Sequence, residues 1–325
     1  MTLPSRASID QFSCFVMELH QRSLTQDPVA LFQWSLEELA RAVDADCSWG
    51  GWADLRHGEV DLCASLSYNL PDDFDLFWSE IKHEDLLARD VMNTGSPVAR
   101  YDRYGSRHTA GMVALSDRYH IDKMAVIVAD QPNSPVSLFM SPYRSGRGAN
   151  AIDAGETAFL RSALDHVRYL IERGGNGGPG AANLLVSAQE RVLYASAEAL
   201  RLVGDRCRGW DANYLPAELG STALRSGRHY LPGWGIVAET TELAHRTGQP
   251  VFGIALRASV PTDRLTSRER QVAEEIANGF THKEIARLLG LSPATVRNHT
   301  QTILMKLGVH SRSTLSKLLH GPQSS

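Results

Sequence analysis

The sequence predicts a multidomain protein in which two α+β segments precede an all-α segment of four helices. Its 325 residues exceed the length of one ordinary domain. Strand-like and helix-like patterns alternate up to about residue 260, whereas only helical patterns follow. Charge divides at the same place, because residues 264–325 hold nine Arg and Lys against four Glu, while the other 263 residues hold 24 basic and 33 acidic residues. We therefore expect a basic segment whose partner is negatively charged.

The composition is typical of a globular protein, with 43% hydrophobic and 22% charged residues. The cysteines are spaced too widely for a metal site or a disulfide framework, so we expect buried thiols in a reducing compartment, with no metal and no cofactor; they are Cys14, Cys47, Cys63 and Cys207. The first residues lack the pattern of a signal peptide, and the apolar run at 124–129 is too short to span a membrane. We expect a cytoplasmic protein without a membrane partner.

Two breaks divide the chain. The run GGNGGPG at 174–180 is unsuited to a helix or a strand, because glycine has high backbone entropy and proline lacks a donor. A second break, VPTDR, falls at 260–264. These breaks predict a sensor domain at 1–173, a linker at 174–180, a module at 181–260 and a last domain at 264–325.

The first segment contains the pattern of a sheet flanked by helices. We predict helices at 28–43, 72–81 and 156–173, a strand pair at 48–55 and 59–68, and a second strand pair at 123–130 and 136–144 around the turn QPNSP. The order of these elements and the amphipathic closing helix resemble a GAF domain. The resemblance implies an α+β sensor domain.

Five aromatic residues of this segment are candidates for a ligand pocket: Trp49, Trp52, Trp78, Tyr101 and Tyr104. Such a pocket would bind a small apolar or aromatic ligand. The competing interpretation is that these side chains belong to the ordinary core.

The second segment begins with a strand, a tight turn, a strand and a helix within residues 183–204. This opening resembles that of a PAS domain, in which a hairpin leads to a helix that covers a hollow. Only 250–259 reads as a further strand. We therefore expect a short PAS-like α+β module.

The last segment specifies its helices locally. Thr266 with Glu269 and Thr281 with Glu284 have the spacing of capping boxes, and Ser292 followed by a proline is typical of a third helix start. A short fourth helix is predicted at 313–320. The connection between the second and third helices is short enough for a helix-turn-helix.

The third helix has two distinct faces. Its apolar face comprises Val296, Thr300, Ile303, Leu304 and Leu307, and its outward face comprises Ala294, Arg297, Asn298, Gln301 and Met305. No Asp or Glu occurs from Ile285 to Ser325. This absence predicts a negatively charged partner.

Four blocks of this segment, LTSRE, THKEIA, SPATVRNH and KLGVHSR, resemble the DNA-binding domain of the LuxR-type transcription regulators at the expected spacing. The resemblance implies that the third helix enters the major groove of double-stranded DNA, where Arg reads guanine and Asn or Gln reads adenine. It also implies contacts from neighbouring residues to phosphate. The predicted DNA-binding residues are Lys283, Ser292, Thr295, Arg297, Asn298, His299, Gln301, Lys306 and Arg312. For His299, packing beside the helix is an equally good interpretation.

Enzymatic signatures are weak. GRGANA at 146–151 matches a dinucleotide-binding pattern but lacks the surrounding parallel unit, and the sequence contains no P-loop, HExxH or GxSxG. We predict no catalytic residues and no enzyme activity, but a one-component transcription regulator. We expect it to bind operator DNA as a homodimer under the control of a small-molecule ligand, with RNA polymerase as a candidate partner. One alternative is that the sensor half is an enzyme acting on a nucleotide or small metabolite, and another is a sigma-factor-like protein.

Overall fold

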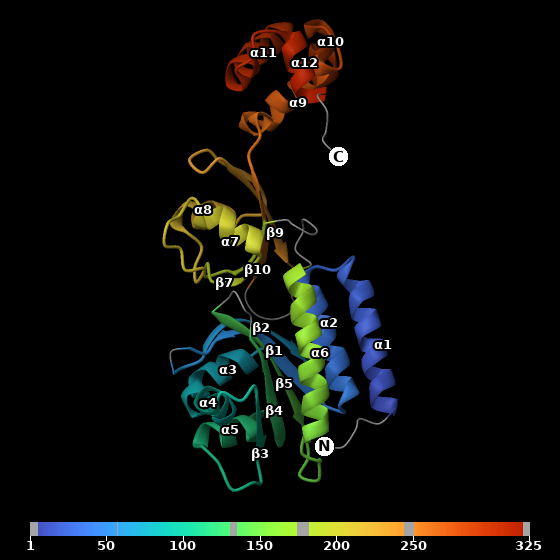
Figure 1. Ribbon diagram of the computed structural model, residues 1–325, viewed down its shortest axis with the longest axis vertical. Coiled ribbons are helices and arrows are strands. Elements are labelled where there is room, and N and C mark those ends of the chain that lie inside the picture. Colours follow the sequence, from blue (N-terminus) through green and yellow to red (C-terminus); the bar gives the residue numbers. More distant parts are fainter. Residues whose placement is uncertain (1–5, 57, 131–134, 174–181, 244–249, 321–325) are drawn as a thin grey trace. The chain divides into compact units, whose positions relative to one another are not determined.

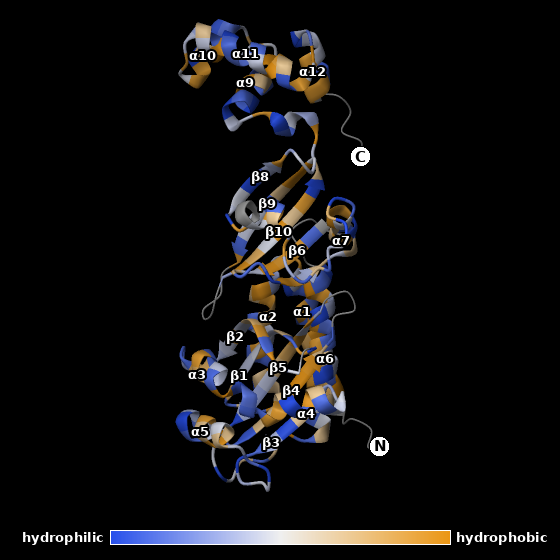
Figure 2. Cartoon of the chain, turned by 90° about the vertical axis from the view of Figure 1, so that its left-hand side faces the viewer, coloured by the Kyte–Doolittle hydropathy of each residue, from blue (hydrophilic) through white to orange (hydrophobic). Residues whose placement is uncertain are grey.

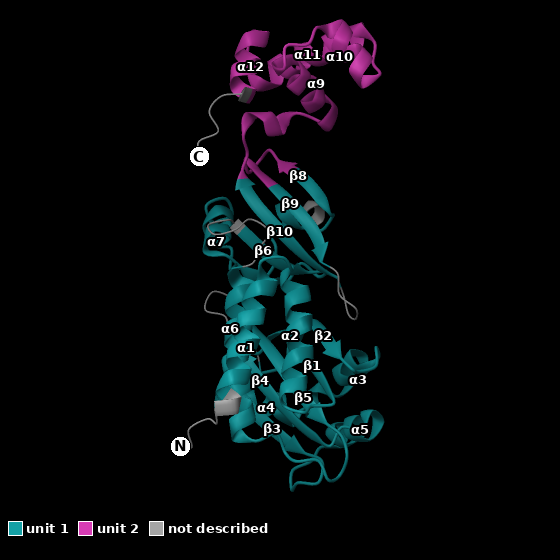
Figure 3. Cartoon of the chain, turned by 90° about the vertical axis from the view of Figure 1, so that its right-hand side faces the viewer, with its two compact units in different colours: residues 1–229, 238–257 teal, residues 230–237, 258–325 magenta. Residues whose placement is uncertain are grey.

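The computed structural model describes residues 6–56, 58–130, 135–173, 182–243 and 250–320 (Figure 1). Its contacts divide the chain into two compact units, residues 1–229 with 238–257 and residues 230–237 with 258–325 (Figure 3). The linker predicted at 174–180 and most of the QPNSP turn lie outside the described residues. The domain limits inferred from the sequence stay predictions.

The first sheet has five strands in the order β2-β1-β5-β4-β3, and neighbouring strands pair antiparallel. The four predicted strands are confirmed as β1 (Cys47–Asp54), β2 (Asp61–Tyr68), β4 (Lys123–Ala129) and β5 (Val136–Arg144). The sequence pattern did not predict β3 (Val98–Asp102), because this strand has only five residues and only two of them are buried.

Helices cover both faces of this sheet (Figure 1). One face carries α1 (Arg6–Ser23), α2 (Pro28–Ala42) and α6 (Ala154–Arg173), and the other carries α3 (Phe74–Ile81), α4 (Leu86–Thr94) and α5 (Ala110–Tyr119), with the short η1 (Lys82–Glu84) after α3. Each face has its own cluster of buried residues. The apolar side of α6 is buried within the chain while its other side is polar (Figure 2), so this helix covers its own sheet.

The second sheet has the same strand order as the first, counted along the chain: β7-β6-β10-β9-β8. The predicted opening is confirmed as β6 (Ala182–Ser187), β7 (Val192–Ala195) and α7 (Ala197–Gly204), and the predicted later strand as β10 (Val251–Ala258). The expectation of only one later strand was wrong, because β8 (Gly227–Leu231) and β9 (Ile236–Leu243) complete the sheet. All residues of β8 are at least partly exposed, which explains its polar sequence. A further helix, α8, spans Ala217–Ala223.

The last four helices form the predicted all-α domain around a compact apolar cluster. They are α9 (Ser267–Ala277), α10 (His282–Leu289), α11 (Pro293–Leu307) and α12 (Arg312–His320), preceded by η2 (Pro261–Arg264). Both predicted capping boxes form. The helices are also tied by side chains, since Arg268 donates to the carbonyl of Leu289 and Ser316 to the carbonyl of Ala277.

Along the described residues, no helix combines the length and apolar character needed to cross a membrane.

Candidate nucleic-acid interface and ligand cavity

A tight turn between α10 and α11 sets the position of the third helix of the domain. Gly290 ends α10 in the left-handed conformation at φ +65°, which glycine adopts without steric cost. Ser292 then caps α11, since its Oγ accepts a hydrogen bond from the Thr295 backbone N–H at 3.0 Å. The hydroxyl groups of Ser292 and Thr295 are also 2.8 Å apart, so both predicted residues shape the start of α11.

The predicted base-reading residues lie together on the exposed side of α11. Arg297, Asn298 and Gln301 are exposed, whereas Val296, Thr300 and Ile303 are buried on the other side. Within the described chain, the side chains of the three exposed residues form no hydrogen bond or ion pair. They are therefore available to donors and acceptors outside the protein.

Lys306 has a structural partner that the sequence did not reveal. Its Nζ donates to both carboxylate oxygens of Glu269, at 2.8 and 2.7 Å. The Glu269 side chain is only 7% exposed and also closes the capping box of α9 through Thr266. Burial acts to raise the pKa of Glu269, but the hydrogen bonds from Lys306 and Thr266 hold this pKa below its ordinary value. Lys306 thus fastens α11 to α9.

The other predicted phosphate contacts differ in their surroundings. Lys283 is exposed on α10, and its ammonium has no partner among the described residues. Arg312 is exposed but donates to the backbone carbonyl of Phe280, which connects α12 to the chain after α9. His299 is half-buried. Arg287, which the sequence interpretation omitted, is a further exposed cation on α10.

His282 links α10 to α11 beneath the outward face. Its Nε2 lies 3.3 Å from the hydroxyl of the buried Thr300. Burial lowers the pKa of His282, and the positive charges of Arg312 and Arg297 lower it further. The neutral imidazole is therefore the form that the fold favours.

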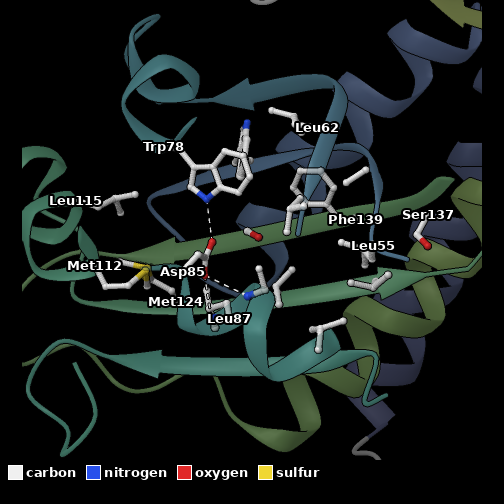
Figure 4. A pocket seen from close by; sticks show the side chains of 18 of the residues that line it. Leu55, Leu62, Trp78, Asp85, Leu87, Met112, Leu115, Met124, Ser137 and Phe139 are labelled. Carbon is white, nitrogen blue, oxygen red and sulfur yellow. Dashed lines mark hydrogen bonds between the residues drawn. The ribbon is translucent and has the colours of Figure 1, made fainter. Parts of the chain in front are cut away.

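The first domain encloses a cavity between its sheet and the helices α4 and α5 (Figure 4). Its volume is about 50 Å³, which exceeds the roughly 10–15 Å³ that one water molecule requires. The walls are mostly aliphatic, methionine and aromatic side chains. The polar groups on the walls are Asp85, Ser137, Ser141 and Tyr143.

Asp85 is the only carboxylate among the lining residues. It caps α4 by accepting from the backbone N–H groups of Leu87 and Ala88, and its other oxygen accepts from the Trp78 indole at 2.8 Å (Figure 4). Burial raises the pKa of Asp85, although these donors oppose the shift. Burial also raises the pKa of Tyr143 well above its usual value, so its hydroxyl stays protonated.

The structure brings only two of the five predicted aromatic residues to this cavity. Trp49 and Trp78 line it. Trp52 is buried on the opposite face of the sheet, because it lies three residues beyond Trp49 and side chains alternate along a strand. Tyr101 borders a separate polar hollow. Tyr104 is 49% exposed and lies against Arg147 and Lys123. The sequence interpretation missed Asp85, although an Asp directly before a helical pattern indicates a cap.

Among the described residues, no three His, Cys, Asp or Glu side chains are grouped in a way that would hold a metal ion.

Comparison with known proteins places the helical domain in a family. The family model of bacterial regulatory proteins, luxR family, matches residues 263–319. The chain is 34% identical over 108 residues to the probable transcriptional regulatory protein SgaR of Hyphomicrobium methylovorum, a match that covers 30% of this chain and 49% of SgaR. It is 30% identical over 175 residues to the nitrate/nitrite response regulator protein NarP of Escherichia coli strain K12, covering 52% of this chain and 76% of NarP. The chain thus spans only about half of the length of SgaR.

A solved structure of SdiA in complex with octanoyl-rac-glycerol is similar over 98% of this chain and 96% of that chain, with 12% identity and a TM-score of 0.40.

Replacing Lys306 tests the structural role of its ion pair. We expect Lys306→Met to lower the free energy of unfolding of the helical domain by about 1–3 kcal/mol, because it leaves the nearly buried Glu269 carboxylate without its cation. Thermal and denaturant unfolding of the full chain, followed by hydrogen exchange in residues 264–320, measures the effect. Lys317→Met on the exposed side of α12 is the matched control and should leave exchange unchanged. Equal stability of both variants would contradict the role given to Lys306.

The pKa of His282 gives a second test. Because the folded state lowers this pKa, the neutral ring stabilises the domain at pH values above the unfolded pKa of about 6.5, and this stabilisation is lost as the pH falls. We expect the ring to titrate below pH 6.5 in the ¹³C-histidine NMR spectrum of the full chain, with the signal assigned by its loss in His282→Gln. A pKa at or above 6.5 would show that the fold does not favour the neutral ring.

Proposed function

The chain belongs to the luxR family of bacterial transcription regulators, and from that premise we propose how it recognises and responds to its partners. The regulator binds operator DNA with α11 in the major groove. Arg297, Asn298 and Gln301 read base edges, since Arg matches guanine and Asn or Gln matches adenine. The remaining predicted residues position the helix or contact phosphate.

One observation carries the proposal for α11. Its exposed side presents donors that no group of the described chain satisfies, and no Asp or Glu occurs from Ile285 onward. A solvated polar face would have no reason to exclude carboxylates over this length. A face that meets phosphates would, because each carboxylate adds repulsion.

We propose a homodimer on DNA, because one helix-turn-helix reads only a few base pairs and symmetric half-sites double the contacts. The apolar side of α6 is used inside the chain, so that helix is a poor candidate for the contact between copies. The exposed residues of α12 are the better candidate, with Leu318 42% exposed among them.

Control by a small molecule is proposed for the cavity of the first domain. The walls suit a mostly apolar ligand, and the Asp85 carboxylate disfavours an anionic one. Phosphorylation is an unsuitable alternative, because receiver domains of response regulators are built on parallel sheets and the paired strands of this sheet are antiparallel. A cytoplasmic location and an absence of catalysis accompany this proposal.

Arg297→Ala distinguishes base reading from attraction by charge. We expect it to weaken binding to a site selected from a random duplex pool by roughly 1–3 kcal/mol, with a much smaller effect on scrambled DNA. Titrations of both duplexes at several salt concentrations give the specificity ratio. The matched control is Lys283→Ala, which should weaken both duplexes about equally and reduce the salt dependence by about one unit. If Arg297→Ala weakens both duplexes equally, α11 is held by charge alone.

Filling the cavity tests the ligand proposal. Ala88 lines the cavity, and Ala88→Leu adds volume where a ligand would lie. We expect mass spectrometry of organic extracts to detect a small molecule that copurifies with the wild-type full chain. The amount of this molecule should fall about tenfold or more with Ala88→Leu, because steric overlap with the ligand costs more than ~1.4 kcal/mol of binding free energy. Ala158→Leu, on the exposed side of α6, is the control and should retain the molecule. Equal retention by both variants would place the ligand elsewhere.

A further inference from the structure

One wall of the cavity presents side chains to both sides of the sheet. The end of the β1–β2 hairpin contributes Ala53, Leu55, Val60 and Leu62 to the cavity, and Figure 4 shows Leu55 and Leu62 there. Side chains alternate along strands, so the residues between them point to the opposite side of the sheet. The β1–β2 register shifts between Trp52 and Ala53, at the start of this wall. Such irregularities re-aim side chains locally.

Asp54 lies on the outer side of this wall and is almost fully buried, with 1% of its side chain exposed. Its Oδ1 accepts from the backbone N–H and the Nε of Arg56, each at 3.0 Å. Its Oδ2 accepts from Arg56 at 2.8 Å and also from Arg191. Burial acts to raise the pKa of Asp54, but the bonds from Arg56 and the charge of Arg191 lower it to about 2. The carboxylate is therefore ionised at neutral pH.

Arg191 belongs to the second sheet's module. It follows the turn between β6 and β7, and 9% of its side chain is exposed. Its guanidinium carbon lies 4.8 Å from the centre of the Tyr214 ring. A second bridge runs beside it, since Arg56 donates to the Asn213 side chain at 2.9 Å.

The segment around Tyr214 is held to the same turn by the backbone. Val192 N–H donates to the carbonyl of Asn213 at 3.0 Å, and Leu215 N–H donates to the carbonyl of Glu190 at 2.8 Å. A shift of Asp54 would therefore act on a turn and a loop of the second module together. Buried ion pairs respond sharply to such shifts, because a charge that loses its partner inside a protein is costly.

We propose that the Asp54–Arg191 ion pair transmits occupancy of the cavity to the second module. The inference rests on the proposed function of the cavity as a ligand site. A ligand that presses on Ala53 and Leu55 moves the strand that carries Asp54. Arg191 follows the carboxylate, and the turn at 187–191 and the loop at 211–215 move with it.

The test uses a double-mutant cycle in the full chain. Ala88→Leu mimics an occupied cavity without an identified ligand. Arg191→Met removes the Asp54–Arg191 ion pair, while Asp54 keeps Arg56 as its partner and the hydrogen bond from Arg56 to Asn213 remains. Hydrogen exchange measured by mass spectrometry reports on the amides of Val192 and Leu215 in each background. With Arg191 present, we expect Ala88→Leu to change the exchange of these amides by about fivefold or more, which is the lower end of typical coupling between sites. With Met at position 191 we expect a much smaller change, carried by the remaining Arg56–Asn213 hydrogen bond.

Three controls make the outcome decisive. Arg201→Met removes an arginine of the same module whose side chain is 75% exposed, and coupling should persist in it. Arg191→Lys keeps a cation and should restore part of the coupling. If Arg191→Met does not fold, Asn213→Ala removes the parallel bridge and should reduce the coupling. Equal exchange changes with and without Arg191, or none in either, would overturn the proposal.

Titration of DNA by the same variants separates the two proposals. If exchange is coupled through Arg191 but Ala88→Leu leaves DNA binding unchanged, the ion pair transmits occupancy and ligand control of DNA binding fails. If Ala88→Leu alters DNA binding equally with Arg191 and with Met at that position, the cavity controls the protein by another route and the role of the ion pair is overturned.

Discussion

A carboxylate withdrawn from water needs donors to replace its hydration, and three of the buried carboxylates among the described residues fix where elements meet. Asp85 accepts hydrogen bonds from two backbone N–H groups and from an indole N–H, and these bonds hold the start of α4 against Trp78. Asp54 accepts hydrogen bonds from two arginines, one in its own hairpin and one in the second module. Glu269 accepts hydrogen bonds from Lys306 and from the backbone at the start of its own helix. The cavity, the contact between the modules and the orientation of α11 all depend on these compensations.

The strand order, which is the same in both sheets, explains how the β1–β2 wall of the cavity contacts both the cavity and the opposite core. In both sheets the first strand of the module lies between its second and fifth strands, so β1 and β6 are flanked on both sides. A flanked strand of an antiparallel sheet presents alternate residues to two layers. In the first sheet one layer is the cavity and the other is the core shared with α2 and α6, to which Leu185 and Leu193 of the second module also belong.

The sequence was informative where local chemistry determines the structure. The capping boxes, the Ser292 cap and the apolar face of α11 form as predicted, because each depends on residues within one or two helical turns. Contacts between residues that are far apart in the sequence could not be predicted from it. Lys306 and Glu269 are 37 residues apart, and Asp54 and Arg191 are 137 apart, so no local pattern indicates either pair. The exposed β8 resembled a loop for lack of an apolar face. The placement of Trp52, in contrast, followed from strand alternation and was overlooked.

The contacts that hold α11 in place limit how the proposed regulator can be controlled. Lys306 joins α11 to α9, Arg268 joins α9 to the end of α10, and Ser316 joins α12 to α9. These contacts hold the four helices together, so under the proposed function the face of α11 that reads bases is already assembled before the domain meets DNA. In that proposal, control acts on how readily two copies reach paired half-sites and not on the shape of the helical domain. In the proposed homodimer, two such domains bind paired half-sites in proportion to the effective concentration of one near the other, which depends on the length and stiffness of the chain that tethers them.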